Sequence, residues 1–373
     1  LPPEPKIFNG RESELSAIIK SFSREVPRIA ILGAGGMGKT SLARAVLHHP
    51  EVASRYDGYR FFVPCDTVSS SIQLARLIGA HVGLESVNDL TGPVIRHFSS
   101  GPPTLLILDN LETVWEPTES RADVEKLLCC LTDVEHLAFI ITMRGAERPA
   151  NVQWTRPFLA PLKPLGHNAA HQTFIDIVDD THKTQDIDTL LLLTDNMPLA
   201  IDLIANLVNS EGIPCVLSRW ETQRTSILSE GHDTRSNLEL SISLSLSGLR
   251  MISSPAALDL LSLLSLLPEG LSDVELLQSQ FPVENIRACK STLLRTSLAY
   301  TDGEKRLKVL VPVREYVHKN HPPHKNLIQP LSKHYQELLE LYRKYSGTIS
   351  NAGVTGSIAC NFANIQNVLL HSL

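Results

Sequence analysis

Residues 31–43, "ILGAGGMGKTSLA", contain a glycine-rich pattern that is typical of phosphate binding. The pattern G-x-x-x-x-G-K-[ST] is matched by Gly33, Gly38, Lys39 and Thr40. Apolar residues precede it, and "TSLARAVLHH" follows it with apolar positions at helical spacing. A strand, a loop and a helix in this order present backbone N–H groups to a phosphate. The segment therefore predicts nucleotide binding, and this context argues against a chance match in a glycine-containing loop.

Each residue type in this loop has a physical role. The glycines let the backbone turn its N–H groups inward without Cβ clashes. Lys39 supplies a positive charge for the β- and γ-phosphates, and the Thr40 hydroxyl is placed to bind Mg²⁺. The expected nucleotide contacts are Gly33, Gly35, Gly36, Met37, Gly38, Lys39, Thr40 and Ser41.

Two acidic residues follow the buried strand predicted in "TLLILDNLE" (104–112). We expect Asp109, at the end of this strand, to help hold Mg²⁺ together with Thr40. Hydrolysis also needs a base that orients water; Asn110 cannot accept a proton, but Glu112 can. The alternatives are that Asp109 is a turn or N-cap acid and that Glu112 is an exposed carboxylate at a helix start.

A cation stands at the end of a further predicted strand, "LAFIITMRGAE" (137–147). Arg144 at this position is a candidate to bind the γ-phosphate through a charge-assisted hydrogen bond. The alternative is a solvated surface arginine. The candidate catalytic residues are thus Lys39, Glu112 and Arg144.

Composition limits the class of protein. The 373 residues suggest two or three domains, and a net charge of −6 gives no support for non-specific nucleic-acid binding. The longest apolar run, 257–267, is too short to span a bilayer, and no signal peptide is visible. The six cysteines lack metal-ligand spacing and read as buried, reduced thiols. We expect a cytoplasmic protein, and the start at Leu1 suggests a piece of a longer one.

The order of predicted elements gives the fold class. Strands are expected at 28–32, 59–63, 104–109 and 138–143, with a shorter one at 157–160. Helical patterns separate them, which predicts an α/β fold with a parallel sheet and helices on both faces. "APLKPLG" (160–166) then marks a boundary, after which helices are expected at 167–180, 186–193, 199–210, 214–225 and 237–249. A hairpin with an Asp302-Gly303 turn and two last helices, 327–345 and 358–370, follow.

The ordered set of motifs resembles one class of ATPase. "IFNGRESEL", "GAGGMGKTSLA", "LLILDNLE", "IITMRG" and "TDNMPLAIDLIA" (194–205) are similar in order to the signal-transduction ATPases with numerous domains, the STAND class. The resemblance is greatest to the NB-ARC and NACHT types, including NOD-like receptors of the fungal kind. It implies a P-loop NTPase domain (1–160), a helical subdomain (161–228), a winged-helix domain (229–322) and the start of tetratricopeptide-like helical repeats (323–373).

The resemblance also implies further site residues. Phe8 and Asn9 of "FNGRE" would pack on adenine, and Pro198 of "NMPLA" would contact it from the helical subdomain. Asp109 and Arg144 take the places of the metal-associated acid and the sensor arginine. The implied cofactors are ATP or ADP and Mg²⁺.

Three positions depart from the patterns of this class. Asn110 replaces a second acid, although Glu112 matches the acid of the NACHT pattern. Asn196 replaces a glycine, and asparagine tolerates a left-handed backbone. The histidine that contacts the ADP β-phosphate in many relatives is missing, because Val309, Leu310 and Val311 occupy that stretch.

Three functions remain in competition. The first is a switch that binds ADP at rest, hydrolyses ATP slowly and self-associates on activation, with protein partners at C-terminal repeats and at a possible N-terminal effector domain. The second is a turnover ATPase or kinase, for which we find no substrate-binding insertion. The third is a transcription regulator that reads DNA with its winged helix; acids interspersed among its basic residues make nucleic acid an unexpected partner.

Overall fold

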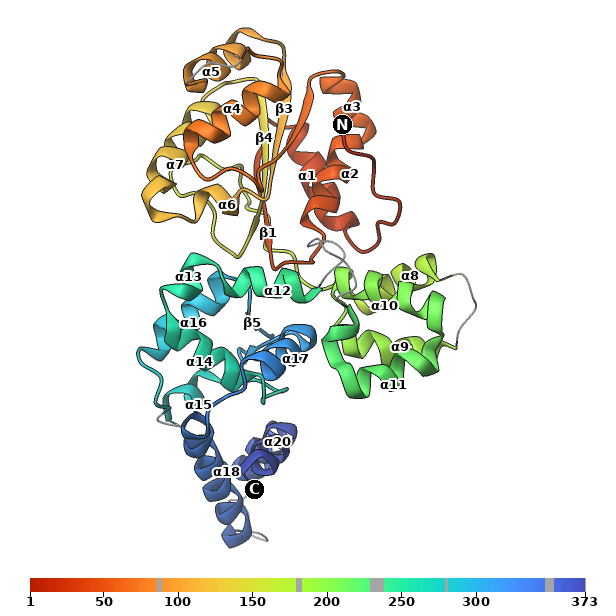
Figure 1. The fold of residues 1–373 in the computed structure, drawn as a ribbon, viewed down its shortest axis with the longest axis vertical. Coiled ribbons are helices and arrows are strands. Elements are labelled where there is room, and N and C mark those ends of the chain that lie inside the picture. Colours follow the sequence, from red (N-terminus) through yellow and green to blue (C-terminus); the bar gives the residue numbers. More distant parts are fainter. Residues whose placement is uncertain (86–88, 179–182, 229–237, 279–280, 346–351, 373) are drawn as a thin grey trace. The chain divides into compact units, whose positions relative to one another are not determined.

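The structure, a computed structural model, describes the chain except for residues 86–88, 179–182, 229–237, 279–280, 346–351 and 373. The chain forms two compact units (Figure 1). The first comprises Leu1–Leu191 and Asn196–Gly212, and the second comprises Leu192–Asp195 and Ile213–Leu373. The finer division into four domains stays a prediction.

A four-stranded parallel sheet forms the centre of the first unit. Its strands lie in the order β1 (Arg28–Gly33), β4 (Leu137–Arg144), β3 (Thr104–Asp109) and β2 (Arg60–Pro64). Every residue of β3 is buried, as expected for a strand covered on both faces. The register pairs Gly33 with Arg144 and Pro64 with Asp109, so the strands end at one common edge.

Helices cover both faces of this sheet (Figure 1). One face carries α1 (Glu12–Phe22), α2 (Lys39–His48) and α3 (Pro50–Tyr56). The other carries α4 (Ser71–His81), α5 (Thr91–Ser100), α6 (Glu112–Trp115) and α7 (Thr118–Thr132). The predicted parallel α/β architecture is therefore confirmed.

The expected short strand at 157–160 is wrong. Among the described residues, the free edge of β1 has only an isolated parallel bridge, between Gly33 and Leu162. Pro157 and Pro161 lack the N–H that a ladder requires, so the segment cannot continue as a regular strand. Gly33 allows the close approach, because a Cβ there would lie 3.0 Å from the Leu162 carbonyl oxygen.

Helices then dominate, as predicted. The first unit continues with α8 (His167–Ile177), most of α9 (Thr184–Thr194) and α10 (Pro198–Glu211). Residues 179–180, the expected end of the first of these helices, lie outside the described residues, as does Asn237, the expected start of a later one.

The second unit is built from helices and one hairpin. Its elements are α11 (Ile213–Gln223), the 3₁₀ helix η1 (Arg224–Leu228), α12 (Leu238–Leu246), α13 (Leu249–Ile252), α14 (Pro255–Leu264), α15 (Asp273–Gln278), α16 (Ile286–Arg295), β5 (Tyr300–Thr301), β6 (Leu307–Lys308), α17 (Val311–Asn320), α18 (Lys325–Tyr345), α19 (Ala352–Ala359) and α20 (Phe362–Ser372). The hairpin predicted around Asp302-Gly303 is confirmed, because β5 and β6 pair in antiparallel fashion.

The last expected helix, 358–370, is instead divided between α19 and α20. Asn361 stands at the break, where its Nδ2 donates to the Ser357 carbonyl oxygen and to Glu275 Oε1. A short amide side chain that bonds the preceding turn competes with helix continuation. Helical periodicity alone does not reveal this break.

The described residues include no helix that is both long enough and apolar enough to cross a membrane. The cysteines are not uniformly buried as expected. Cys65 and Cys289 are buried, whereas Cys215 and Cys360 are exposed.

Candidate nucleotide-binding site

The phosphate loop connects β1 to α2, and two of its glycines are left-handed. Gly36 and Gly38 have φ angles of +76° and +81°, which residues with a Cβ adopt only at a cost. Gly38 is the residue before α2, so the loop leads directly to the unpaired N–H groups of a helix N-terminus. This is the geometry that binds an anion such as phosphate.

Lys39 is held inside the loop. Its side chain is buried, and Nζ donates to the carbonyl oxygens of Gly33 (3.1 Å) and Ala34 (2.7 Å). Burial lowers the pKa of the ammonium from 10.5 to about 8, an effect that the Glu112 carboxylate opposes and the Arg144 guanidinium reinforces. An ammonium held by two carbonyl groups can exchange them for phosphate oxygens.

Asp109 connects the loop to the sheet. The Thr40 hydroxyl donates to Asp109 Oδ1 (2.9 Å), which also accepts the Thr142 hydroxyl (2.6 Å). The carboxyl is fully buried, and burial raises its pKa while both hydroxyl bonds lower it. Asp109 is therefore not a solvated turn acid but the centre of a buried polar cluster.

The same atoms suit a magnesium ion. Hydroxyl and carboxylate oxygens are the donors that Mg²⁺ prefers, and those of Thr40 and Asp109 already lie within hydrogen-bonding distance. These two residues would hold the ion, which would neutralise phosphate charge when bound. Their chemistry thus fits the metal role expected from the sequence.

Asn110 stabilises the turn after β3 and has no role in proton transfer. Its φ of +58° is left-handed, which asparagine tolerates better than most residues. Its N–H donates to Thr142 Oγ1 (3.0 Å), and its Nδ2 donates to Asp66 Oδ1 (2.6 Å). The turn places the next acid, Glu112, at the end of β4.

Glu112 and Arg144 form an ion pair at the edge of the sheet. Arg144 Nε lies 3.2 Å from Glu112 Oε1, and the Arg144 N–H donates to Glu112 Oε2 at 3.2 Å. Glu112 is only 8% exposed, which removes the alternative of an exposed carboxylate at a helix start. Nor is Arg144 a solvated surface side chain. The candidate base and the candidate phosphate sensor therefore contact each other.

The start of α10 packs directly on the phosphate loop. The Leu199 N–H donates to the Gly36 carbonyl oxygen (3.2 Å), and a Cβ at Gly36 would lie 3.0 Å from Leu199 Cβ. Pro198 occupies the first turn of α10, where a missing N–H costs nothing. Asn196 has a φ of +55°, so the left-handed backbone expected for it is confirmed.

Phe8 and Asn9 lie before α1, and their side chains have other contacts. Asn9 Nδ2 donates to Asp176 Oδ2 (2.8 Å) and Thr173 Oγ1 (3.3 Å) on α8. Phe8 lines a surface hollow together with residues of α1 and with His49. Their predicted contact with adenine stays a prediction.

Arg11 and Thr142 belong to the site but were not among the expected site residues. Arg11 is buried, and its Nη2 donates to the carbonyl oxygens of Met37 (3.1 Å) and Lys163 (2.6 Å). It thus ties the loop to the segment that follows the sheet. A signal exists for Thr142, since it is a hydroxyl inside an otherwise apolar strand. For Arg11 the signal is its place in the "FNGRE" motif, from which only Phe8 and Asn9 were expected to contact the nucleotide.

Comparison with known families gives one match. Residues 2–156 match the family model "novel STAND NTPase 1", a stretch that includes the phosphate loop, Asp109, Glu112 and Arg144. This match supports a nucleotide-binding P-loop ATPase of the STAND class and implies the use of a nucleotide and Mg²⁺. The NB-ARC assignment and the fungal type are not decided by it. No curated protein matches the sequence.

Comparison with solved structures supports the fold. A Walker-type ATPase of Pyrococcus abyssi is 14% identical with a TM-score of 0.58, over 85% of this chain and 99% of that chain. A STAND protein with a tetratricopeptide repeat sensor from Pyrococcus horikoshii is 17% identical with a TM-score of 0.37, over 99% of this chain and 54% of that one. The Orc1 protein of Aeropyrum pernix in complex with DNA is 14% identical with a TM-score of 0.45, over 85% and 94%. The first shares the P-loop ATPase fold with this chain; the other two are less similar in structure.

Proposed function

We propose that this chain is a nucleotide-operated switch that binds ADP at rest, exchanges it for ATP, hydrolyses ATP slowly and self-associates in the ATP form. The observation that carries this proposal is the Arg144–Glu112 ion pair beside the buried Lys39. A γ-phosphate at this edge would compete with Glu112 for the Arg144 guanidinium. ATP and ADP differ in that group alone, and only such differential contacts shift a conformational equilibrium.

Slow hydrolysis follows from the same pair. Glu112 is the acid near the loop that is placed to orient water, but it already bonds the Arg144 side chain and N–H. A base with occupied oxygens accepts a proton poorly. We therefore expect a rate far below the roughly 1–100 s⁻¹ of kinases.

The resting state must be held without the histidine that many relatives use. Leu310 stands at its position and is buried as the residue before α17. The Val311 N–H instead donates to Asp195 Oδ2 (3.2 Å) within the second unit. A carboxylate repels a phosphate and cannot contact it as a histidine does, so the contribution of Asp195 is to fix the start of α17.

DNA recognition by the second unit is the rival function. Several of its basic residues are already paired: Arg306 with Glu275, Lys308 with Asp302, and Lys290 with Asp273. The acidic partners offset the positive charge that a DNA-binding face needs, which supports the switch over a DNA reader. A DNA titration at 50 and 200 mM salt tests the rival; tight, salt-sensitive binding would favour it.

The decisive experiment measures size and shape. Protein loaded with ADP and protein loaded with a non-hydrolysable ATP analogue are compared by light scattering and small-angle X-ray scattering, with and without Arg144→Ala. We expect a compact ADP monomer, an enlarged and self-associating ATP form, and no ATP response in the variant. If both nucleotides give one size and shape, even in the longest available form of the protein with its activating ligand, the switch proposal fails.

A further inference from the structure

Among the first-unit arginine side chains that have no hydrogen-bonding or ionic partner in the described part of the chain, three line one or both of two neighbouring hollows. Arg28 begins β1, and Arg148 and Arg156 lie in the segment after β4. The Nε of Arg28 is buried without an acceptor. Guanidinium groups carry five N–H donors, and leaving them unpaired in a partly buried place costs free energy.

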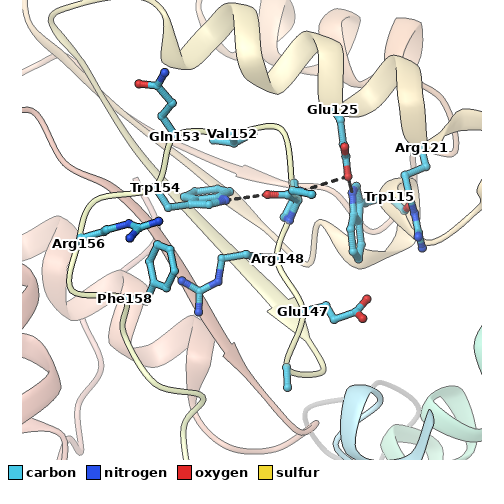
Figure 2. A pocket seen from close by; sticks show the side chains of 13 residues that line it. Trp115, Arg121, Glu125, Glu147, Arg148, Val152, Gln153, Trp154, Arg156 and Phe158 are labelled. Atoms are coloured by element: carbon cyan, nitrogen blue, oxygen red, sulfur yellow. Dashed lines mark hydrogen bonds between the residues drawn. The ribbon is translucent and has the colours of Figure 1, made fainter. Parts of the chain in front are cut away.

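Aromatic rings hold two of these cations in place (Figure 2). The Cζ of Arg148 lies 4.0 Å from the centre of the Phe158 ring, and that of Arg156 lies 5.1 Å from it. Trp154 stacks on Phe139, and its Nε1 donates to the Pro149 carbonyl oxygen. Such stacking fixes the guanidinium groups and leaves their N–H edges available.

The arginines line concave space. A cavity of about 790 Å³ is bounded by Trp115, Trp154 and Phe158 together with Arg148 and Arg156. A smaller hollow of about 140 Å³ is lined by Trp154 and Phe158 together with Arg28 and Arg148. The larger volume lies within the usual range of small-molecule sites, roughly 300–1,000 Å³.

The larger cavity has a net positive charge, because three arginines and two glutamates line it. Glu125 accepts from Trp115 Nε1 (2.9 Å) and Asn151 Nδ2 (2.6 Å), so its oxygens are already engaged. Glu147 also lines the cavity. Burial lowers the pKa of the Arg148 guanidinium.

We propose that this cavity binds a small molecule carrying two or more carboxylate or phosphate groups, held by Arg148 and Arg156. Planar guanidinium groups bind both anion types in the same bidentate way. The site is separate from the phosphate loop and does not depend on the switch function. Arg121 is a minor contributor, because its Nε and Nη2 already donate to the carbonyl oxygens of Trp115 and Glu116.

The test uses the chain saturated with ADP, so that the phosphate loop is filled. Succinate and pyrophosphate are titrated separately at constant free Mg²⁺, with calorimetry and the fluorescence of Trp115 and Trp154 as readouts. The variants are Arg148→Met and Arg156→Met, which keep an apolar stem against Phe158. Arg96→Met on α5 is the charge-matched control, because Arg96 is exposed and lines neither hollow.

We expect saturable binding of at least one probe to the unmodified chain and to the control. Each cavity variant should bind it at least tenfold more weakly, with an unchanged affinity for ADP. Equal binding by all variants, or no saturable binding of either probe, would overturn the proposal. Binding of a hexaglutamate peptide without binding of either small anion would also overturn it and make the cavity a docking surface for an acidic protein segment.

Discussion

At the scale of single residues, Lys39 gives the site a pH dependence. Its ammonium pKa is lowered to about 8, and phosphate pairing requires the protonated form. As the pH rises through 8, the free protein loses this proton and must regain it to bind. The affinity for ADP should therefore fall between pH 8 and 9, by up to about tenfold per pH unit. Calorimetry in buffers of different ionisation enthalpy measures both the affinity and the proton uptake.

The Lys39→Ala variant complements that measurement. It removes a charge that pairs with phosphate, and each hydrogen bond to a charged group is worth about 1.5–3 kcal/mol. We expect the ADP affinity to fall by about 100-fold or more while the far-ultraviolet circular dichroism stays unchanged. An unchanged affinity in the folded variant would show that the nucleotide binds elsewhere.

Glu112 is the residue on which the hydrolysis prediction depends. Glu112→Gln keeps an oxygen for the Arg144 N–H but removes the proton acceptor and the ion pair. Single-turnover hydrolysis should slow by about tenfold or more, which is less than the roughly 10²–10⁴-fold effect of an unoccupied general base because Arg144 engages both Glu112 oxygens. The affinity for ATP should stay the same or increase, because the variant lacks the carboxylate that neutralises the Arg144 guanidinium. A wild-type rate in this variant would leave Glu112 as a positioning partner of Arg144.

At the scale of elements, the sequence predicts what is local. The strand at 104–109 and the hairpin around Asp302 follow from apolar runs and turn residues, and the structure confirms both. The phosphate loop is equally local. Its glycines and its position before α2 can be read from a few adjacent residues.

Contacts between distant segments were not predictable in the same way. The Glu112–Arg144 pair joins residues 32 positions apart, and Arg11 bonds Lys163 across 152 positions. The periodicity of apolar residues does not reveal such pairings, because they depend on how strands and loops meet in the folded chain. The strand expected at 157–160 is wrong for a local reason. Its apolar residues predicted a strand, although Pro157 and the following Pro161 lack the N–H groups that a strand ladder requires.

The start of α17 gives an element-scale prediction. Asp195 accepts the Val311 N–H in the first turn of this helix, and loss of such a cap costs about 0.5–2 kcal/mol. In Asp195→Ala, amide exchange at Val311 should accelerate by about tenfold, as a loss near 1.4 kcal/mol requires. Asp195→Asn retains an acceptor and should change it much less. Equal acceleration in both variants would assign the effect to the negative charge, which faces Arg314 and Lys308.

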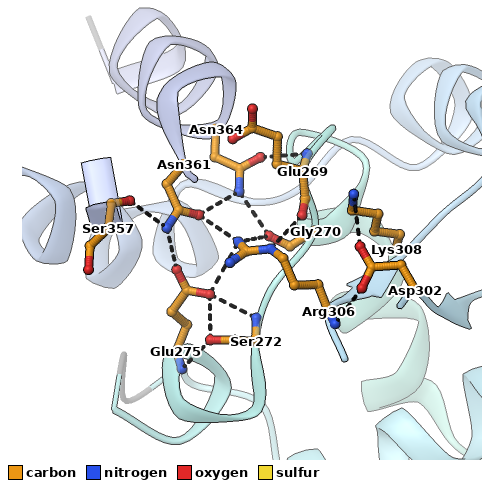
Figure 3. Close-up of polar contacts among 10 residues, drawn as sticks. All are labelled: Glu269, Gly270, Ser272, Glu275, Asp302, Arg306, Lys308, Ser357, Asn361 and Asn364. Carbon is orange, nitrogen blue, oxygen red and sulfur yellow. Dashed lines mark hydrogen bonds and ion pairs between the residues drawn. The ribbon is translucent and has the colours of Figure 1, made fainter. Parts of the chain in front are cut away.

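At the scale of the whole molecule, a buried polar network joins the C-terminal residues Asn361 and Asn364 to the rest of the second unit (Figure 3). Arg306 Nη2 donates to the Gly270 carbonyl oxygen (2.8 Å) and to Asn361 Oδ1 (2.6 Å). Asn364 Nδ2 also donates to the Gly270 carbonyl oxygen (2.8 Å), and its Oδ1 accepts the Glu269 N–H (3.0 Å). A displacement of α20 would therefore disturb the turn that pairs with β6.

This network predicts that Asn364 holds α20 to the turn at Glu269 and Gly270. In Asn364→Ala the Gly270 carbonyl oxygen still accepts a hydrogen bond from Arg306, but the Glu269 N–H loses its acceptor. The loss should lower the free energy of unfolding by about 1–3 kcal/mol. Amide exchange should rise in α20 and at Glu269, while the sheet of the first unit stays protected and ADP affinity is retained. Asn367→Ala is the matched control, since its side chain makes a longer, partly buried bond to the Leu266 carbonyl oxygen (3.2 Å). Equal exchange in the two variants would mean that ordinary apolar packing, rather than this network, holds α20 to the second unit.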